Sequence, residues 1–169
     1  MIPFRSLRRL TNPDEPLSPY ILNAWAVATI PAIVISMVVG LFASPEAITA
    51  QEQAVVPPEI PFAVTAVSVI VFAPLFETGI MMGLFALSRL AGASEALQVA
   101  IQVAFWALLH GAVATLWAFA PAWLFFVFAS VFVTQRKNGL WQAFLVTSAV
   151  HALNNLVAMV AIGFERLSG

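Results

Sequence analysis

The residues with the clearest chemical potential are an acid, two imidazoles and a carboxamide, all set in apolar surroundings: Glu77, His110, His151 and Asn155. A carboxylate can act as a general base, a neutral imidazole can transfer a proton, and ring or amide N–H groups can stabilise a developing oxyanion. His151 and Asn155 are four residues apart, so on a helix they project from one face. These are the side-chain types that hydrolysis of a peptide bond needs.

Composition places these residues in a membrane. The 169-residue chain is 62% hydrophobic and 9% charged, with a mean hydropathy of +0.96, which lies outside the range of soluble domains. A net charge of −1 without any basic run argues against a nucleic-acid partner. The chain has no cysteine, so it can form neither a disulfide nor a thiolate metal site. We expect one membrane domain over residues 1–169, in contact with membrane lipid.

Five apolar segments predict an all-α fold, a polytopic transmembrane helical bundle, because a spanning helix needs about 20 apolar residues. The fourth is short and rich in phenylalanine, so it either spans with help from its neighbours or enters only partway. The first is expected to stay attached as a signal anchor, because its apolar stretch is about twice as long as a signal-peptide core. The five segments are Tyr20–Phe42, Pro61–Leu87, Leu97–Phe119, Ala122–Thr134 and Leu140–Ile162.

The cations predict the orientation of the bundle. With five spans, six of the seven cations fall on one side, which the positive-inside rule assigns to the cytoplasm. The segment 43–60 carries three glutamates and no cation, and is predicted to lie outside together with Arg166. We therefore expect a cytoplasmic N-terminus, and an integral protein of the cytoplasmic membrane of a prokaryote. The six cations are Arg5, Arg8, Arg9, Arg89, Arg136 and Lys137.

The three ionisable groups are predicted to lie at a similar depth. From the helical rise of about 1.5 Å per residue, Glu77 lies about 18 Å from the cytoplasmic end of its span, His110 about 22 Å and His151 about 21 Å. A charged side chain at mid-bilayer costs about 2.5–3.5 kcal/mol on insertion scales, so such groups face a polar interior and pair with one another. We expect the three side chains to meet.

Nearby residues predict how the helices pack around this point. Pro74 cannot donate a hydrogen bond to the preceding turn and should kink its helix one turn before the glutamate. Gly79 and Gly83 form a small-xxx-small pair that lets another backbone approach closely. Asn154 points about 60° away from the face of the last histidine, and is predicted to form an interhelical hydrogen bond.

Three stretches contain these residues: APLFETGIMMGLF (73–85), FWALLH (105–110) and NGLWQAFLVTSAVHALNN (138–155). In order and spacing they resemble the motifs of the CPBP intramembrane proteases, the family that includes the Ras-converting CAAX prenyl endopeptidase and bacteriocin-processing proteins. The resemblance covers about residues 65–158. Its most specific part is the closing His-x-x-x-Asn element, which follows a Gly-Leu-Trp helix start.

The first family motif is incomplete in this chain. The family has a Glu-Glu pair followed, four residues later, by an arginine, whereas this chain has Glu77, Thr78 and Met82 at those positions. The second motif, Phe-x-x-x-His, begins with Trp106 instead of phenylalanine.

The resemblance implies a function as an endopeptidase that cuts a membrane-associated peptide or protein. It implies that Glu77 and His110 activate water, while His151 and Asn155 form the oxyanion site. No cofactor is expected for this reaction.

Three other functions fit the same residues. Glu77, His110 and His151 could hold a divalent metal such as zinc and leave a fourth position open, although no H-E-x-x-H pair is present. A proton or ion relay is the second alternative, because acids and histidines in membranes also mark conduction paths. The third is a catalytically weakened CPBP relative that acts as a binding or assembly subunit with a membrane protein partner.

Overall fold

Five helical stretches are long and apolar enough to cross a membrane, as predicted. The computed structural model describes residues 8–168, so Arg5 lies outside the described residues, and no β-strand occurs within that range. The all-α prediction is confirmed, and the chain is an integral membrane protein. The five stretches are α2 (Leu17–Gly40), the continuous helix Phe62–Leu90, α6 (Glu95–Val113), the segment Thr115–Asn138, and α8 (Leu140–Ser168).

The boundary between the third and fourth spans differs most from its prediction. The third span ends at Val113 and not at Phe119. The fourth begins with a 3₁₀ turn, η2 (Thr115–Ala118), and continues through α7 (Phe119–Gln135) into a second 3₁₀ turn, η3 (Arg136–Asn138). The fourth span is therefore full length, and partial insertion is not needed.

A single extended residue makes the reversal between these two spans. Ala114 has φ −149° and ψ 125°, which ends α6 and turns the chain back. Gly111 allows the close return, because a Cβ there would lie 3.0 Å from the Cβ of Ala118. The residues around Ala114 include no proline and no cluster of turn-forming residues. The sequence stays apolar through the turn, so the end of the third span could not be predicted from it.

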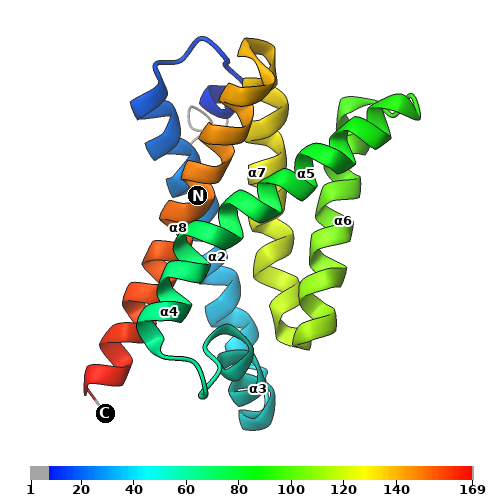
Figure 1. Cartoon of the computed structure of the whole chain (residues 1–169). Helices are drawn as coiled ribbons and strands as arrows, with labels where there is room; N and C mark the ends of the chain where they lie inside the picture. The colour runs from blue at the N-terminus through cyan, green and yellow to red at the C-terminus, as the bar shows by residue number, and fades with distance from the viewer. Residues whose placement is uncertain (1–7, 169) are drawn as a thin grey trace.

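The central helix of the bundle is α7, the segment whose length was in doubt. It packs against α2, α6 and α8, and Figure 1 shows it between α6 on one side and the α2 and α8 pair on the other. In its span 44% of the apolar stretch is buried, more than in the other four. A helix that is apolar on all sides is typical of such an enclosed position.

The predicted outside segment contains a helix that the sequence analysis did not identify. Helix α3 (Pro45–Val55) is capped by Ser44, whose Oγ accepts a hydrogen bond of 3.3 Å from the N–H of Ala47. Pro45 occupies the first turn and Glu46 complements the helix dipole there. The sequence Ser44-Pro45-Glu46 is typical of a helix start and could have predicted this helix.

The second span consists of three consecutive pieces: α4 (Phe62–Val67), a π-helical turn η1 (Ser68–Phe72) and α5 (Ala73–Leu90). Figure 1 shows this span crossing the bundle obliquely, from beside α8 to the far end of α6. The contacts agree, because α5 and η1 contact α8, and α5 also contacts α6. The oblique path brings the glutamate of α5 against α8.

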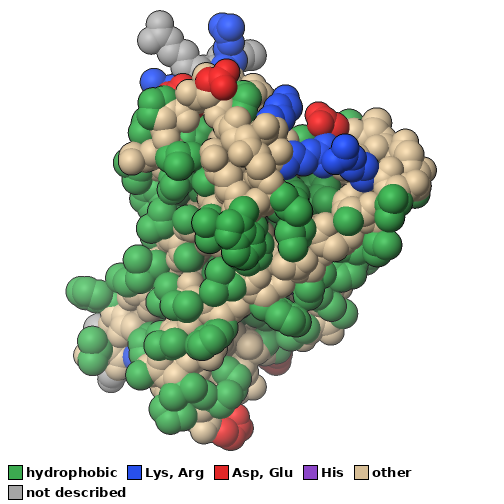
Figure 2. All heavy atoms as spheres, turned by 45° about the horizontal axis from the view of Figure 1, so that its top comes forward, with side chains coloured by type: hydrophobic (Ala, Val, Ile, Leu, Met, Phe, Trp, Pro, Cys, Tyr) green, Lys and Arg blue, Asp and Glu red, His purple; other side chains and the backbone are tan. Residues whose placement is uncertain are grey.

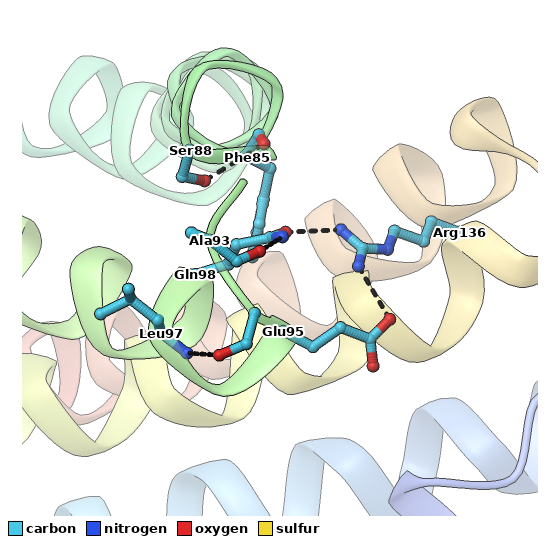
Figure 3. A network of polar contacts seen from close by, with 8 residues as sticks. Phe85, Ser88, Ala93, Glu95, Leu97, Gln98 and Arg136 are labelled. Atoms are coloured by element: carbon cyan, nitrogen blue, oxygen red, sulfur yellow. Dashed lines mark hydrogen bonds and ion pairs between the residues drawn. The ribbon is translucent and has the colours of Figure 1, made fainter. Parts of the chain in front are cut away.

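A polar network holds the α5–α6 hairpin to the end of α7 (Figure 3). The Arg136 guanidinium donates to Gln98 Oε1 and pairs with Glu95 Oε1, both at 2.9 Å. Gln98 in turn donates to the Ala93 carbonyl at 2.7 Å, and the guanidinium lies 5.9 Å from the centre of the Phe85 ring. This network helps to fix the two helices that carry Glu77 and His110.

Most of the cations gather at one end of the molecule. Figure 2 shows Lys and Arg side chains gathered at one end. η3 carries Arg136 and Lys137 at this end, and it is tied to the N-terminal segment because Asn138 donates to the Pro13 carbonyl at 2.7 Å. Helix α3, with its glutamates, lies at the other end (Figure 1). The separation follows the positive-inside pattern, and the cytoplasmic assignment of the cationic end stays a prediction.

Candidate functional site

Glu77 on α5 and His151 on α8 face each other inside the bundle. The Nε2 atom of His151 lies 3.8 Å from Oε2 of Glu77, and the two side chains are 5% and 19% exposed, respectively. This distance is longer than a hydrogen bond. Oε2 of Glu77 and Nδ1 of His151 are both buried without a hydrogen-bond partner in the protein. Because buried polar atoms normally have partners, the pair has the capacity to bind a water or a polar group of a substrate.

Aromatic rings form the wall behind this pair. The imidazole of His151 stacks on Phe128, with ring centroids 4.5 Å apart, and meets Phe125 edge-on at 5.7 Å. Phe125 also contacts the imidazole of His110, at 5.5 Å between centroids. One phenylalanine therefore contacts both histidines. Of the three ionisable groups predicted to meet, Glu77 and His151 form a pair, and His110 is connected to them through this ring.

His110 lies in the last turn of α6 with its tautomer set by the backbone. Its Nδ1 is 2.9 Å from the carbonyl oxygen of Trp106. A carbonyl can only accept, so Nδ1 carries the proton, and in the neutral ring Nε2 is a hydrogen-bond acceptor. The ring also meets Trp117 edge-on at 5.1 Å. The free lone pair is suited to receive a hydrogen bond from a water molecule.

Asn155 completes the hydrogen bonding of the π-helical turn before Glu77. In an α-helix the N–H of Ala73 would donate to Val69, but here it donates to the carbonyl of Ser68. The next residue, Pro74, has no N–H. The Val69 carbonyl therefore lacks a helical donor, and Asn155 Nδ2 donates to it at 2.8 Å. At the position where Pro74 predicted a kink, the structure has a π-helical turn. Asn155 of α8 donates to the carbonyl that this turn leaves without a helical donor.

The register change leads to a stability prediction. Replacing Asn155 with alanine leaves the Val69 carbonyl without its donor, and we expect the free energy of unfolding to fall by about 1–2 kcal/mol. Pro74→Ala returns an N–H to this turn. In that background the cost of Asn155→Ala should therefore drop to roughly 0.5 kcal/mol or less. Unfolding of all four proteins in mixed micelles, at increasing denaturant, measures the difference, and an equal cost in both backgrounds would contradict this role.

The neighbouring asparagine holds two helices together, as predicted. Asn154 Oδ1 accepts a hydrogen bond of 3.1 Å from the Thr29 hydroxyl of α2, and its Nδ2 donates to Asn155 Oδ1 at 3.2 Å. The glycine prediction is wrong for contacts within the chain. A Cβ built on Gly79 or Gly83 meets no atom within 4 Å, because α5 crosses the bundle with this face turned away from its neighbours.

The positions at which the chain departs from the CPBP motif hold uncharged residues in the core. Thr78 is fully buried, and its hydroxyl has no hydrogen-bond partner. Met82 is partly buried and packs against the hydrophobic core. A second glutamate at position 78 would add a fully buried carboxylate, whereas threonine adds none. Water activation at this site would therefore depend on the single carboxylate of Glu77.

Four further polar side chains lie one or two turns from the histidines, and the sequence analysis named only one of them, Trp106, as a motif residue. Each has a buried nitrogen or oxygen atom without a partner in the protein. The amide of one of them, Gln102, also donates to the Met81 carbonyl at 2.9 Å, which links α6 to α5. The four-residue spacing of positions 98, 102, 106 and 110 was a signal for a polar face on α6. The four residues are Gln102, Trp106, Thr147 and Ser148.

The metal alternative receives no geometric support in the described part of the chain. Among residues 8–168, no three His, Cys, Asp or Glu side chains are grouped closely enough to hold a metal ion. The zinc site of Glu77, His110 and His151 stays a prediction from the sequence.

Comparisons with protein-family models, with curated proteins and with solved structures found no match to this chain. The resemblance to the CPBP proteases therefore stays a prediction from the motifs. A function for this chain has to be argued from its own residues and their geometry.

Proposed function

We propose that this protein is an intramembrane endopeptidase of the CPBP type, which hydrolyses a peptide bond of a membrane-associated protein or peptide. The observation that carries the proposal is the pair formed by Glu77 and His151. A carboxylate oxygen and an imidazole nitrogen lie 3.8 Å apart, and both side chains have a buried polar atom that no protein group binds. Structural ion pairs and hydrogen bonds in membranes usually satisfy such atoms, since leaving them unpaired is costly.

Glu77 is the proposed general base. In its ionised form it takes a proton from water, whose oxygen then attacks the carbonyl carbon of the substrate peptide bond. The lone pair on Nε2 of His110 orients the water. In the second step the C–N bond breaks, and the proton that Glu77 took from water passes through Nε2 of His110 to the leaving amine, which returns Glu77 to its ionised form.

His151 and Asn155 are the proposed oxyanion site. The ring N–H of His151 donates to the oxygen that becomes negative in the tetrahedral intermediate. The Asn155 amide has two N–H groups, of which one is occupied by the Val69 carbonyl, so the other remains for the substrate. The same side chain would then set the π-helical turn and contact the reacting group.

Reconstitution tests the proposed hydrolysis. The full chain is purified, placed in lipid vesicles and incubated in isotope-labelled water with a set of membrane-tethered peptides. Mass spectrometry should find new peptide termini, with one labelled oxygen in each new carboxylate. If no peptide is cut under conditions in which the protein stays folded, the protease proposal is wrong.

A binding or assembly subunit is the second candidate, and the exposed glycine face of α5 favours it. Gly83 is exposed, and a Cβ on either Gly79 or Gly83 would meet open space. Small residues four apart allow a helix of another protein to approach closely. This face is therefore available to a membrane protein partner.

Co-purification from native membranes tests the assembly alternative. The His110→Ala/His151→Ala double variant should still bring down a stable partner, whereas Gly79→Leu/Gly83→Leu should lose it because the larger side chains keep the backbones apart. Recovery of monomer alone from native membranes would exclude this function.

A further inference from the structure

An apolar groove of about 450 Å³ runs between the start of the second span and the last turns of α8. All but one of its lining residues lack a polar side chain; the exception is Arg166. Both walls belong to helices that are long and apolar enough to cross the membrane, so the surrounding medium is lipid. Residues from the two walls include Phe62, Ala66 and Ile70 on one side and Met159, Gly163 and Arg166 on the other.

A glycine shapes the groove. A Cβ on Gly163 would lie 3.2 Å from Cζ of Phe62, which is closer than ordinary van der Waals contact, and 3.4 Å from its Cε1. The absence of a side chain at 163 lets the phenylalanine ring lie against α8. The ring also holds the one cation of the groove, because the Arg166 guanidinium lies 5.5 Å from its centre.

The charge at the end of this groove is unusual for its side of the molecule. Within the described range 8–168, Arg166 is the one Lys or Arg of α8 and lies in its last turn. Figure 2 shows most Lys and Arg side chains at the opposite end of the molecule. A planar guanidinium binds phosphate oxygens in a two-pronged geometry. An apolar groove that ends at a guanidinium is complementary to an amphiphile with an anionic phosphate.

We propose that this groove binds an acyl chain of an anionic phospholipid whose phosphate pairs with Arg166. The chain lies along the apolar wall, and the head group remains at the membrane surface where α8 ends. Ile70 connects this lipid to the candidate site, because it belongs to the π-helical turn whose Val69 carbonyl is bound by Asn155. The proposal does not depend on peptide hydrolysis.

Lipid retention tests this site. The full chain is reconstituted in vesicles of equal phosphatidylglycerol and phosphatidylcholine, extracted in mild detergent and examined by native mass spectrometry. We expect the wild type to retain phosphatidylglycerol over phosphatidylcholine by about fivefold, the effect of one cation near the surface. Arg166→Gln should abolish the preference. The matched control Lys137→Gln, which removes an exposed cation at the other end, should keep it.

A second variant tests the groove independently of charge. Gly163→Leu places a side chain against Phe62 and into the groove, so the retained lipid should fall for both head groups. Equal retention of the two lipids by the wild type, or an unchanged preference in Arg166→Gln, would overturn the proposal. Loss of the preference in Lys137→Gln would also overturn it, since it would show an effect of overall charge.

Discussion

Glu77→Gln is expected to lower the rate of peptide hydrolysis by a factor of about 10²–10⁴, the usual contribution of a general base. Glutamine has nearly the same shape as glutamate, but its amide cannot take a proton from water. The substitution should leave the fold intact, because Oε2 of Glu77 makes no hydrogen bond within the protein. It also removes an ionisable group from the membrane, where charge is costly.

The assay for this variant is the turnover of a membrane-tethered peptide by purified protein in vesicles, with thermal unfolding measured on the same samples. Glu59→Gln is the matched control, because it makes the same chemical change on an exposed residue of the predicted outside segment. Its turnover should equal that of the wild type. Undiminished turnover by Glu77→Gln would show that the carboxylate is not the base, and the proposed mechanism would have to be abandoned.

The second large effect is expected from His151→Phe. A phenyl ring can keep the stacking on Phe128 and the edge contact with Phe125. The substitution therefore removes the ring nitrogens and keeps an aromatic ring, one atom larger, in the same place. If the His151 N–H stabilises the oxyanion, kcat should fall by about 10²–10³, the cost of losing one such donor. KM should change little, because the interaction forms in the transition state and not with the bound substrate.

Single-turnover and steady-state kinetics of His151→Phe separate these quantities. A structural role for the imidazole would instead lower the unfolding temperature and raise KM while kcat stayed within a few-fold of the wild type. His151→Gln is a useful companion, since its amide N–H returns a donor to the site. Partial recovery of kcat in this variant relative to His151→Phe would tie the loss to hydrogen bonding.

From the sequence, the depth of the candidate site in the membrane could be predicted, but not which side chains lie next to one another. The similar depths of Glu77 and His151 followed from their distances to the charged helix ends, and the structure places the two side chains together. The contact of His110 with Phe125 could not be anticipated, because it depends on which face of α7 turns toward α6. The hydrogen bond from Asn155 to the Val69 carbonyl could not be anticipated either. Pro74 shows from the sequence that one backbone N–H donor is missing. The donor that replaces it is the amide of Asn155, which lies 86 residues after Val69.

The sequence by itself determined the membrane class, the helical fold, the five spans and the gathering of most cations at one end. These are local properties, since the cost of placing a residue in lipid and the rise of a helix depend little on its distant neighbours. Tertiary structure decided the reversal at Ala114, the central position of α7, the oblique path of α5 and the pairing of Glu77 with His151. Helices in lipid gain no hydrophobic energy by associating, so their rotation and order depend on close packing and on a few interhelical hydrogen bonds, and only the assembled bundle decides which of these form.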